Sequence, residues 1–113
     1  MENGSFSGVV VGRIVNVVPH SNADHLSVCE VDVGQNLPLQ IVCGASNVRA
    51  GLKVAVALIG AVLPDNWKIK KSKLRGIESF GMLCSAQELG LSTASDGILE
   101  LADDYEVGVD LVL

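Results

Sequence analysis

The sequence lacks the features of a membrane or secreted protein. It has no apolar run near the roughly 18 residues that a spanning helix needs. Its first residues, MENGSFSG, are not basic and no signal-peptide pattern follows them. We therefore expect a cytoplasmic protein with no membrane partner.

The sequence also lacks the motifs of common catalytic and cofactor sites. His20, Asp24, His25 and Cys29 carry donor atoms at metal-like intervals, but no second close pair such as C-x-x-C accompanies them. There is no G-x-x-x-x-G-K-[ST] phosphate loop, and no serine or cysteine has a histidine at a spacing typical of a triad. We expect no catalytic residue, no metal and no cofactor in this chain.

Cysteines and aromatic residues are few. The three cysteines are odd in number, widely spaced and set in apolar stretches, which indicates reduced thiols in the core. Of the four aromatic residues, Trp67 is expected in the core because Ile69 shares its face, and Phe80 is the one candidate for stacking on a base. So few aromatics favour recognition of phosphates and shape over base sequence.

Cations are scarce except in one short segment. Residues 1–66, 67–75 and 76–113 carry formal charges of −2, +5 and −8, and the last segment has no Lys or Arg. A basic block in an acidic chain indicates an anionic partner. The alternative is a solvated loop or edge strand, where lysines also prevent edge pairing.

Short strands dominate the pattern. Five are expected, over 9–18, 29–33, 39–43, 52–58 and 67–74, with a bulge near Lys71 and Ser72 in the last. Asn47 to Gly51 is expected to hold a helical turn, and Ser85 and Glu88 have the S-x-x-E spacing of a capping box. The sequence therefore predicts an all-β fold, a five-stranded barrel of the oligonucleotide-binding (OB) type with one or two short helices. A β-sandwich is the alternative.

Three segments carry a family resemblance: HSNADHLSVCEVDVG, QIVCGASNVRAGLKVAVALIGAVLP and KIKKSKLRGIESFGMLCSAQELGL. Together they resemble the tRNA-binding OB domain of bacterial phenylalanyl-tRNA synthetase β subunits. The resemblance implies that residues 9–113 form this domain and that residues 1–8 are an N-terminal extension or an added remnant. It also implies tRNA, the other β-subunit domains and the α subunit of an α2β2 enzyme as partners, with ATP and magnesium used elsewhere in the parent enzyme.

The resemblance also suggests site residues. The family's motif positions fall on Asn22 and Asp24 of the N-A-D turn and on Gly81 of S-x-G-M. The residues expected to bind tRNA are Asn47, Lys70, Lys73, Arg75, Ser79 and Met82. Structural roles are the alternatives: turn formation for Asn22 and Asp24, a cap on the turn at Val48 for Asn47, and core packing for Met82.

The chain departs from the family pattern at three positions. Ser21 replaces a turn proline, His25 replaces a lysine, and Phe80 replaces a glutamate. Two other functions stay open at this point. One is a stand-alone dimeric tRNA-binding or chaperone-like protein, and the other is a docking module of the synthetase with little RNA contact.

Overall fold

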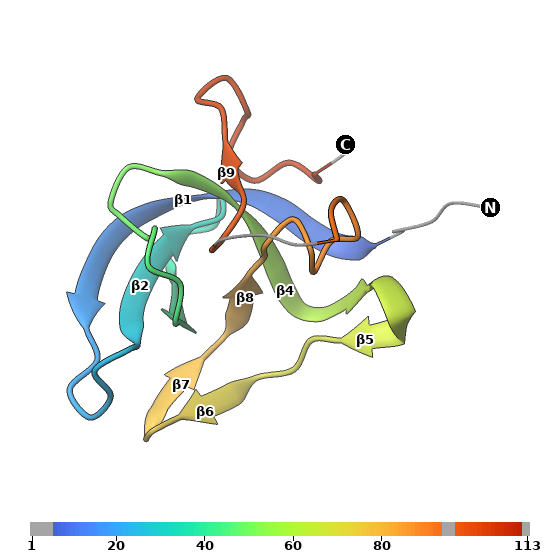
Figure 1. Cartoon of the computed structure of the whole chain (residues 1–113). Helices are drawn as coiled ribbons and strands as arrows, with labels where there is room; N and C mark the ends of the chain where they lie inside the picture. The colour runs from blue at the N-terminus through green and yellow to red at the C-terminus, as the bar shows by residue number, and fades with distance from the viewer. Residues whose placement is uncertain (1–5, 94–96, 112–113) are drawn as a thin grey trace.

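The structure is a computed structural model and describes residues 6–93 and 97–111 (Figure 1). Its elements, in chain order, are β1 (Ser7–Pro19), β2 (Ser27–Asp32), β3 (Leu39–Cys43), β4 (Lys53–Leu63), the 3₁₀ helix η1 (Pro64–Asn66), β5 (Trp67–Lys68), β6 (Ser72–Leu74), β7 (Ile77–Ser79), β8 (Gly81–Leu83) and β9 (Glu100–Leu101). Within the described ranges, no helix has the length and apolarity that crossing a membrane requires.

The strands form one strongly curved sheet that closes into a barrel, with β1 as the central strand of the sheet. Antiparallel pairing gives the order β3-β2-β1-β4, and β8 adds to β4 through the Val56↔Leu83 pair. Just before β8 the chain reaches β3, where the Phe80 N–H donates to the Gln40 carbonyl at 2.8 Å. β3 and β8, the two ends of this strand order, thus meet and close the barrel (Figure 1). The expected all-β, OB-type fold is confirmed.

The fifth barrel strand is not the one that the sequence predicted. Residues 67–74 divide into β5, which pairs with the end of β4, and β6, which pairs with β7 in a separate two-stranded sheet. The expected bulge at Lys71 is a break between these two strands. The strand that completes the barrel is β8, a segment for which the sequence predicted no strand. Gly81 is needed there because an added Cβ would lie 2.8 Å from the Ala57 carbonyl oxygen of β4.

Two apolar clusters lie on opposite faces of β1 and β4. The barrel interior contains Val10, Ile14 and Val56, whereas Val11 and Ala57 belong to a second cluster. The C-terminal segment and the turn after β8 cover that second cluster with Leu89, Leu101 and Leu111. A β4 buried on both faces explains its continuous apolar sequence, VAVAL.

The predicted capping box forms. The Glu88 N–H donates to Ser85 Oγ at 3.1 Å, and the Ser85 N–H donates to Glu88 Oε1 at 2.8 Å. The segment makes one hydrogen-bonded turn that ends at Gly90, whose φ is 77°. By contrast, Asn47 to Gly51 forms non-helical turns, so the helical turn predicted there is wrong.

The thiols are placed as expected. Cys29 and Cys84 are buried, Cys43 is half-buried, and all three are free. Burial raises the pKa of Cys29 to about 11 and that of Cys84 to about 12, so both stay protonated at neutral pH.

Candidate nucleic-acid interface

Residues 67–80 form an arm that leaves the barrel after β4 and returns through β8; we call it the basic arm. Its outer part is the β6–β7 hairpin, closed by Arg75 and Gly76. Both residues have positive φ, 51° and 89°, as the two central positions of a type I′ turn require. This tight turn places Arg75 at the tip of the arm.

Three of the predicted tRNA-binding cations lie exposed on this arm: Lys70, Lys73 and Arg75. In the described part of the chain there are two ion pairs, Arg49–Glu100 and Lys71–Glu78, so none of the three has a carboxylate partner there. Lys71 differs, because its Nζ also lies 5.7 Å from the centroid of the Phe80 ring. Lys68 is also exposed and outside both ion pairs, so the arm presents four cations without a carboxylate partner among the described residues, while Lys71 stabilises the hairpin.

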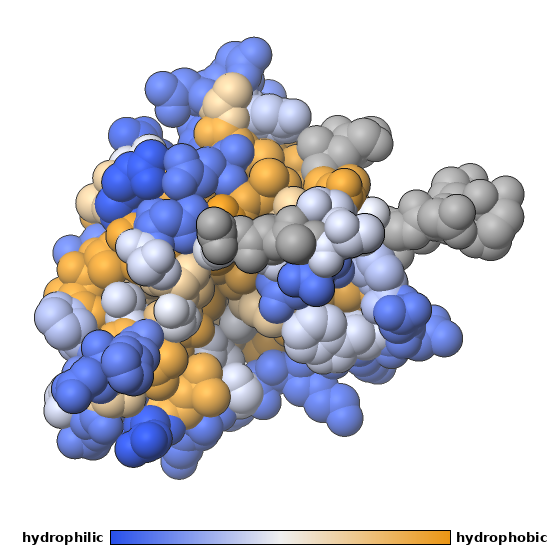
Figure 2. Space-filling model, viewed as in Figure 1, coloured by the Kyte–Doolittle hydropathy of each residue, from blue (hydrophilic) through white to orange (hydrophobic). Residues whose placement is uncertain are grey.

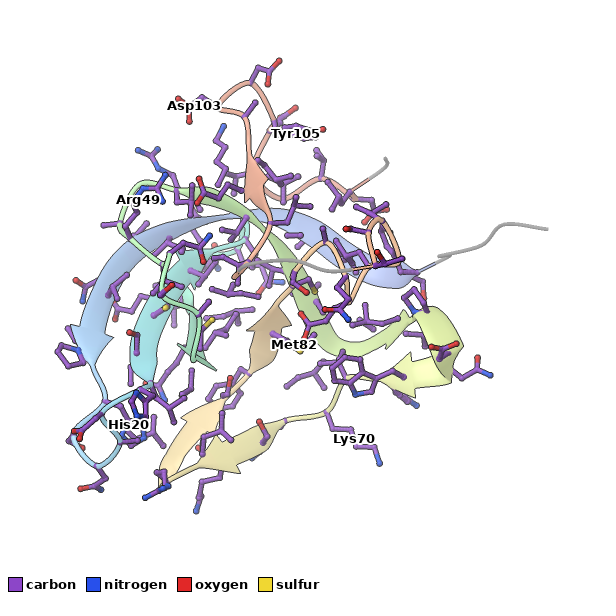
Figure 3. All side chains as sticks on the ribbon, in the orientation of Figure 1. His20, Arg49, Lys70, Met82, Asp103 and Tyr105 are labelled. Carbon is purple, nitrogen blue, oxygen red and sulfur yellow. The ribbon has the colours of Figure 1, made fainter. Side chains whose placement is uncertain are left out.

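His20, for which the sequence predicted no role in RNA binding, attaches the arm to the barrel. Buried His20 follows β1, and its Nδ1 accepts a hydrogen bond from the Asn22 N–H at 2.9 Å. Its Nε2 lies 2.8 Å from the Leu74 carbonyl oxygen, which can only accept. The ring is thus neutral with its proton on Nε2. Figure 3 shows His20 beside the turn end of the hairpin.

The arm bounds two hollows in the surface. One lies between the arm and the 18–28 region, and its lining includes Lys73, Gly76 and Gln40. The other, which we call the Trp67 groove, lies on the other side of the arm and has a volume of about 640 Å³. Its lining includes Trp67, Lys70 and residues from β3, β8 and the capped turn. Figure 2 shows this face hollowed between the arm and the barrel.

Trp67 lines this groove and is 46% exposed, so the expectation of a core residue is wrong. Ile69, which was expected to share its face, is buried, and it lies beyond the end of β5 at Lys68. Phe80, the predicted stacking residue, is half-buried beneath the Lys71 ammonium. Of these two aromatic side chains, Trp67 is the more exposed.

Ser79 and Met82, which were both predicted to contact tRNA, differ in accessibility. Ser79 is 2% exposed; its hydroxyl accepts from the Val42 N–H and donates to the Gly81 carbonyl, each at 3.0 Å. It closes the barrel between β3 and β8. Met82 is half-buried and lines the Trp67 groove (Figure 3). A direct contact with RNA is therefore geometrically open to Met82 but not to Ser79 in this conformation.

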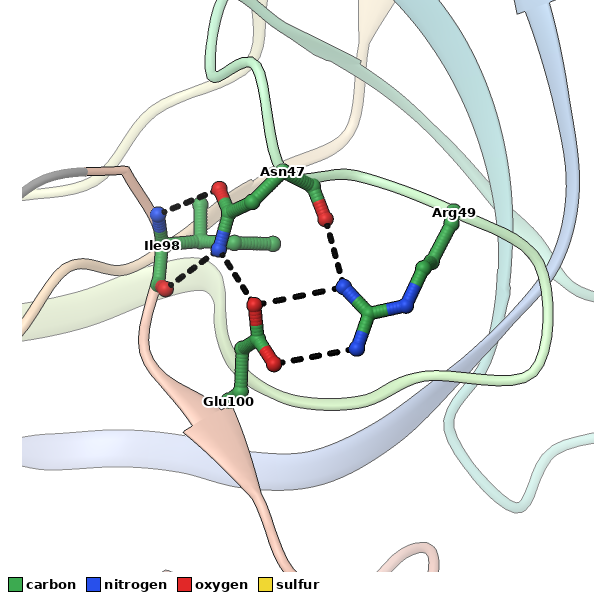
Figure 4. A network of polar contacts seen from close by, with 4 residues as sticks. All are labelled: Asn47, Arg49, Ile98 and Glu100. Atoms are coloured by element: carbon green, nitrogen blue, oxygen red, sulfur yellow. Dashed lines mark hydrogen bonds and ion pairs between the residues drawn. The ribbon is translucent and has the colours of Figure 1, made fainter.

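Asn47 belongs to a separate network (Figure 4). Its Oδ1 accepts from the Ile98 N–H, and its Nδ2 donates to the Ile98 carbonyl, both at 3.0 Å. Nδ2 also donates to Glu100, which pairs with Arg49 through two hydrogen bonds. The Arg49 and Asn47 hydrogen bonds lower the pKa of Glu100. Asn47 thereby attaches the C-terminal segment to the barrel instead of capping Val48, and its predicted contact with tRNA stays a prediction.

The N-A-D turn lies close to the arm. Asn22 and Asp24 are both exposed, and the Asn22 backbone bonds to His20. The acidic C-terminal segment, residues 97–111, lies away from the arm. Figure 3 shows Asp103 and Tyr105 of this segment at the end of the molecule opposite to Lys70. Asp103 and the basic arm thus lie at opposite ends of the molecule.

Comparison with known proteins gives consistent relatives. The phenylalanine–tRNA ligase β subunit of Methylococcus capsulatus is 60% identical over 106 residues, which cover 94% of this chain and 13% of the relative. The β subunit of Legionella pneumophila strain Lens is 56% identical over 108 residues, covering 96% of this chain and 14% of the relative. The chain thus spans only a small part of the length of the relatives that it matches.

Solved structures share the fold. The MetRS-related protein from Pyrococcus horikoshii superposes with a TM-score of 0.68 at 21% identity, over 92% of this chain and 88% of that one. The C-terminal domain of Plasmodium vivax p43 gives 0.63 at 24% identity, over 88% and 56%. A family model described as "Putative tRNA binding domain" matches residues 9–110. The resemblance predicted from the sequence is confirmed, and the chain belongs to this tRNA-binding domain family.

Proposed function

We propose that this chain is the non-catalytic tRNA-binding module of a phenylalanine–tRNA ligase β subunit, and that the basic arm holds tRNA by its phosphates. The observation that carries the proposal is the exposure of Lys70, Lys73 and Arg75, without carboxylate partners among the described residues, on an arm of an otherwise acidic domain. Phosphate contacts of this kind position a nucleic acid without reading its bases.

The rest of the molecule supports such an encounter. The acidic C-terminal segment lies at the end of the domain opposite to Lys70 (Figure 3), so it repels RNA from that end and favours approach to the arm. His20 and the type I′ turn fix the direction of the hairpin, so that the backbone carrying Lys73 and Arg75 is already in place before RNA binds.

The two relatives reported above, both named as β subunits of the ligase, support this choice of parent protein. In this setting the chain's partners are tRNA, the other β-subunit domains and the α subunit of an α2β2 enzyme in the cytoplasm. ATP and magnesium belong to chemistry in other parts of that enzyme, and this module contributes tRNA affinity.

The test is tRNA binding by the triple variant Lys70→Ala, Lys73→Ala, Arg75→Ala. We expect at least about tenfold weaker binding at low salt, equal for every tRNA species. Arg13→Ala is the matched control, because Arg13 is an exposed cation on β1 outside the arm. Unchanged affinity in the triple variant would contradict the proposal and favour a docking module that barely touches RNA.

A further inference from the structure

The Trp67 groove has the dimensions and lining of a site for a small flat ligand. Its volume of about 640 Å³ lies within the range of roughly 300–1,000 Å³ typical of ligand pockets. Apolar side chains, among them Trp67, Leu74, Met82 and Ile98, form much of its lining. The Trp67 side chain is 46% exposed, which is unusual because tryptophan, the largest side chain, is on average highly buried.

The charges around the groove favour an anion. Lys68 and Lys70 belong to its lining and are exposed, and the other cations of the basic arm follow within five residues. Glu88 is the one acid among the described residues that line the groove, and its Oε1 accepts the Ser85 N–H in the capping box, so with two lysines the lining keeps a net positive charge. A ligand with an aromatic ring and a phosphate matches an indole with two lysines beside it.

The aromatic part of such a ligand must have a free face. Bases within a duplex are covered on both faces by their neighbours, so only an unpaired base can lie against the Trp67 ring. Stacking of this kind tolerates any base, because every base has a π-face. It is therefore compatible with phosphate contacts that do not read sequence.

We propose that the Trp67 groove receives one unpaired nucleotide of the bound RNA, with its base against the Trp67 indole and its phosphate at Lys68 and Lys70. This inference rests on the proposed function, because the basic arm brings the RNA to the groove. It adds a substrate class: RNA with an unpaired or extruded base adjoining the segment held by the arm.

The chain offers a direct probe, since Trp67 is its single tryptophan. The experiment measures Trp67 emission and affinity with three RNAs of equal length: a single strand, an abasic strand with the same phosphates, and a blunt duplex. We expect the single strand to quench Trp67 and to bind about fivefold or more tighter than the abasic strand. We expect the other two RNAs to leave the emission nearly unchanged.

Variants separate stacking from packing. Trp67→Ala should reduce affinity for the single strand to that for the abasic strand, whereas Trp67→Phe should keep most of the difference. Leu37→Ala is the control, because Leu37 is 76% exposed on the loop between β2 and β3 and lines neither hollow. It should bind both strands as the unaltered chain does.

Equal affinity for the single and abasic strands, together with unchanged Trp67 emission, would overturn the inference. If salt-dependent tRNA binding through Lys73 and Arg75 persisted in that case, the proposed function would stand without the groove. Emission that responds to a poly-glutamate peptide but not to RNA would also overturn the inference, and would assign the groove to an acidic peptide.

Discussion

The His20 ring donates from Nε2 to the Leu74 carbonyl oxygen at 2.8 Å, across 54 residues of sequence. Its other nitrogen accepts from the Asn22 N–H, so both polar atoms of a buried ring are satisfied. The bond joins the turn after β1 to the hairpin that carries Lys73 and Arg75. The placement of the cations therefore depends on a residue that carries no charge in this tautomer.

His20→Ala should release the hairpin from the barrel. It leaves the Leu74 carbonyl and the Asn22 N–H without their partner, and we expect a loss of about 1–2 kcal/mol in the free energy of unfolding. His25→Ala is the control, since His25 is exposed. Urea denaturation measures both variants, and equal stability of the two would show that the His20 hydrogen bonds contribute nothing.

Gly97→Ala should break the attachment of the C-terminal segment. Gly97 has a φ of +81°, and an added Cβ would lie 2.2 Å from Asn47 Oδ1. Gly51→Ala is the matched control, because Gly51 has a φ of +92° but nothing within 4 Å of such a Cβ. Both variants incur roughly 1–2 kcal/mol of backbone strain, and Gly97→Ala should lose at least about 1 kcal/mol more through the Asn47 hydrogen bonds. Thermal unfolding of the two variants measures this difference; its absence would contradict the assigned role of Asn47.

Ser85→Ala should destabilise the chain by about 0.5–2 kcal/mol, because the Glu88 N–H loses its acceptor. The reciprocal bond allows a second comparison. Glu88→Gln keeps a side-chain acceptor for the Ser85 N–H, whereas Glu88→Ala removes it. Chemical denaturation should place Glu88→Gln closer to the unaltered chain than Glu88→Ala; the reverse order would argue against the capping box.

The buried thiols should make the fold sensitive to alkali. Unfolded thiols titrate near 9.0, whereas burial raises the pKa of Cys84 to about 12 and that of Cys29 to about 11. Between these values the unfolded chain binds fewer protons than the folded chain, so stability falls as pH rises above 9. Each thiol contributes a slope of about −1.4 kcal/mol per pH unit.

Cys84→Ala isolates this effect from the titration of tyrosine and lysine. Its unfolding free energy, measured by urea titration between pH 8 and 11, should fall less steeply than that of the unaltered chain. The absolute stability of the variant does not matter for the comparison. Parallel pH dependence in the two proteins would contradict the protonated, buried state of Cys84.

Local sequence patterns predicted most of the barrel. The apolar LQIVC segment is β3 at its predicted bounds, and Cys29, Val31 and Val33 are buried on one face as their alternation indicated. The error at the fifth strand has a physical cause. Residues 67–70 alternate like a strand, but alternation does not specify a partner. β8 has only three residues and begins with Gly81, so it is too short for a periodic signal.

The site was only partly predictable for a similar reason. A concentration of charge is visible in sequence, and it identified Lys70, Lys73 and Arg75. The exposure of Trp67 depends on the gap between the arm and β8, which is a product of tertiary packing. His20 gives no local signal of its bond to Leu74, because its partner is a backbone atom distant in the chain.

The salt dependence of tRNA binding tests the central claim most directly. Three phosphate contacts predict that the logarithm of the association constant falls against the logarithm of salt concentration with a slope of about −2 to −3, at about −0.7 to −0.9 per contact. The triple variant Lys70→Ala, Lys73→Ala, Arg75→Ala should have a far shallower slope, because only Lys68 and the paired Lys71 are left as cations of the basic arm. Each single substitution should remove about one unit. An unchanged slope in the triple variant would contradict the assignment of the basic arm as the phosphate-binding element.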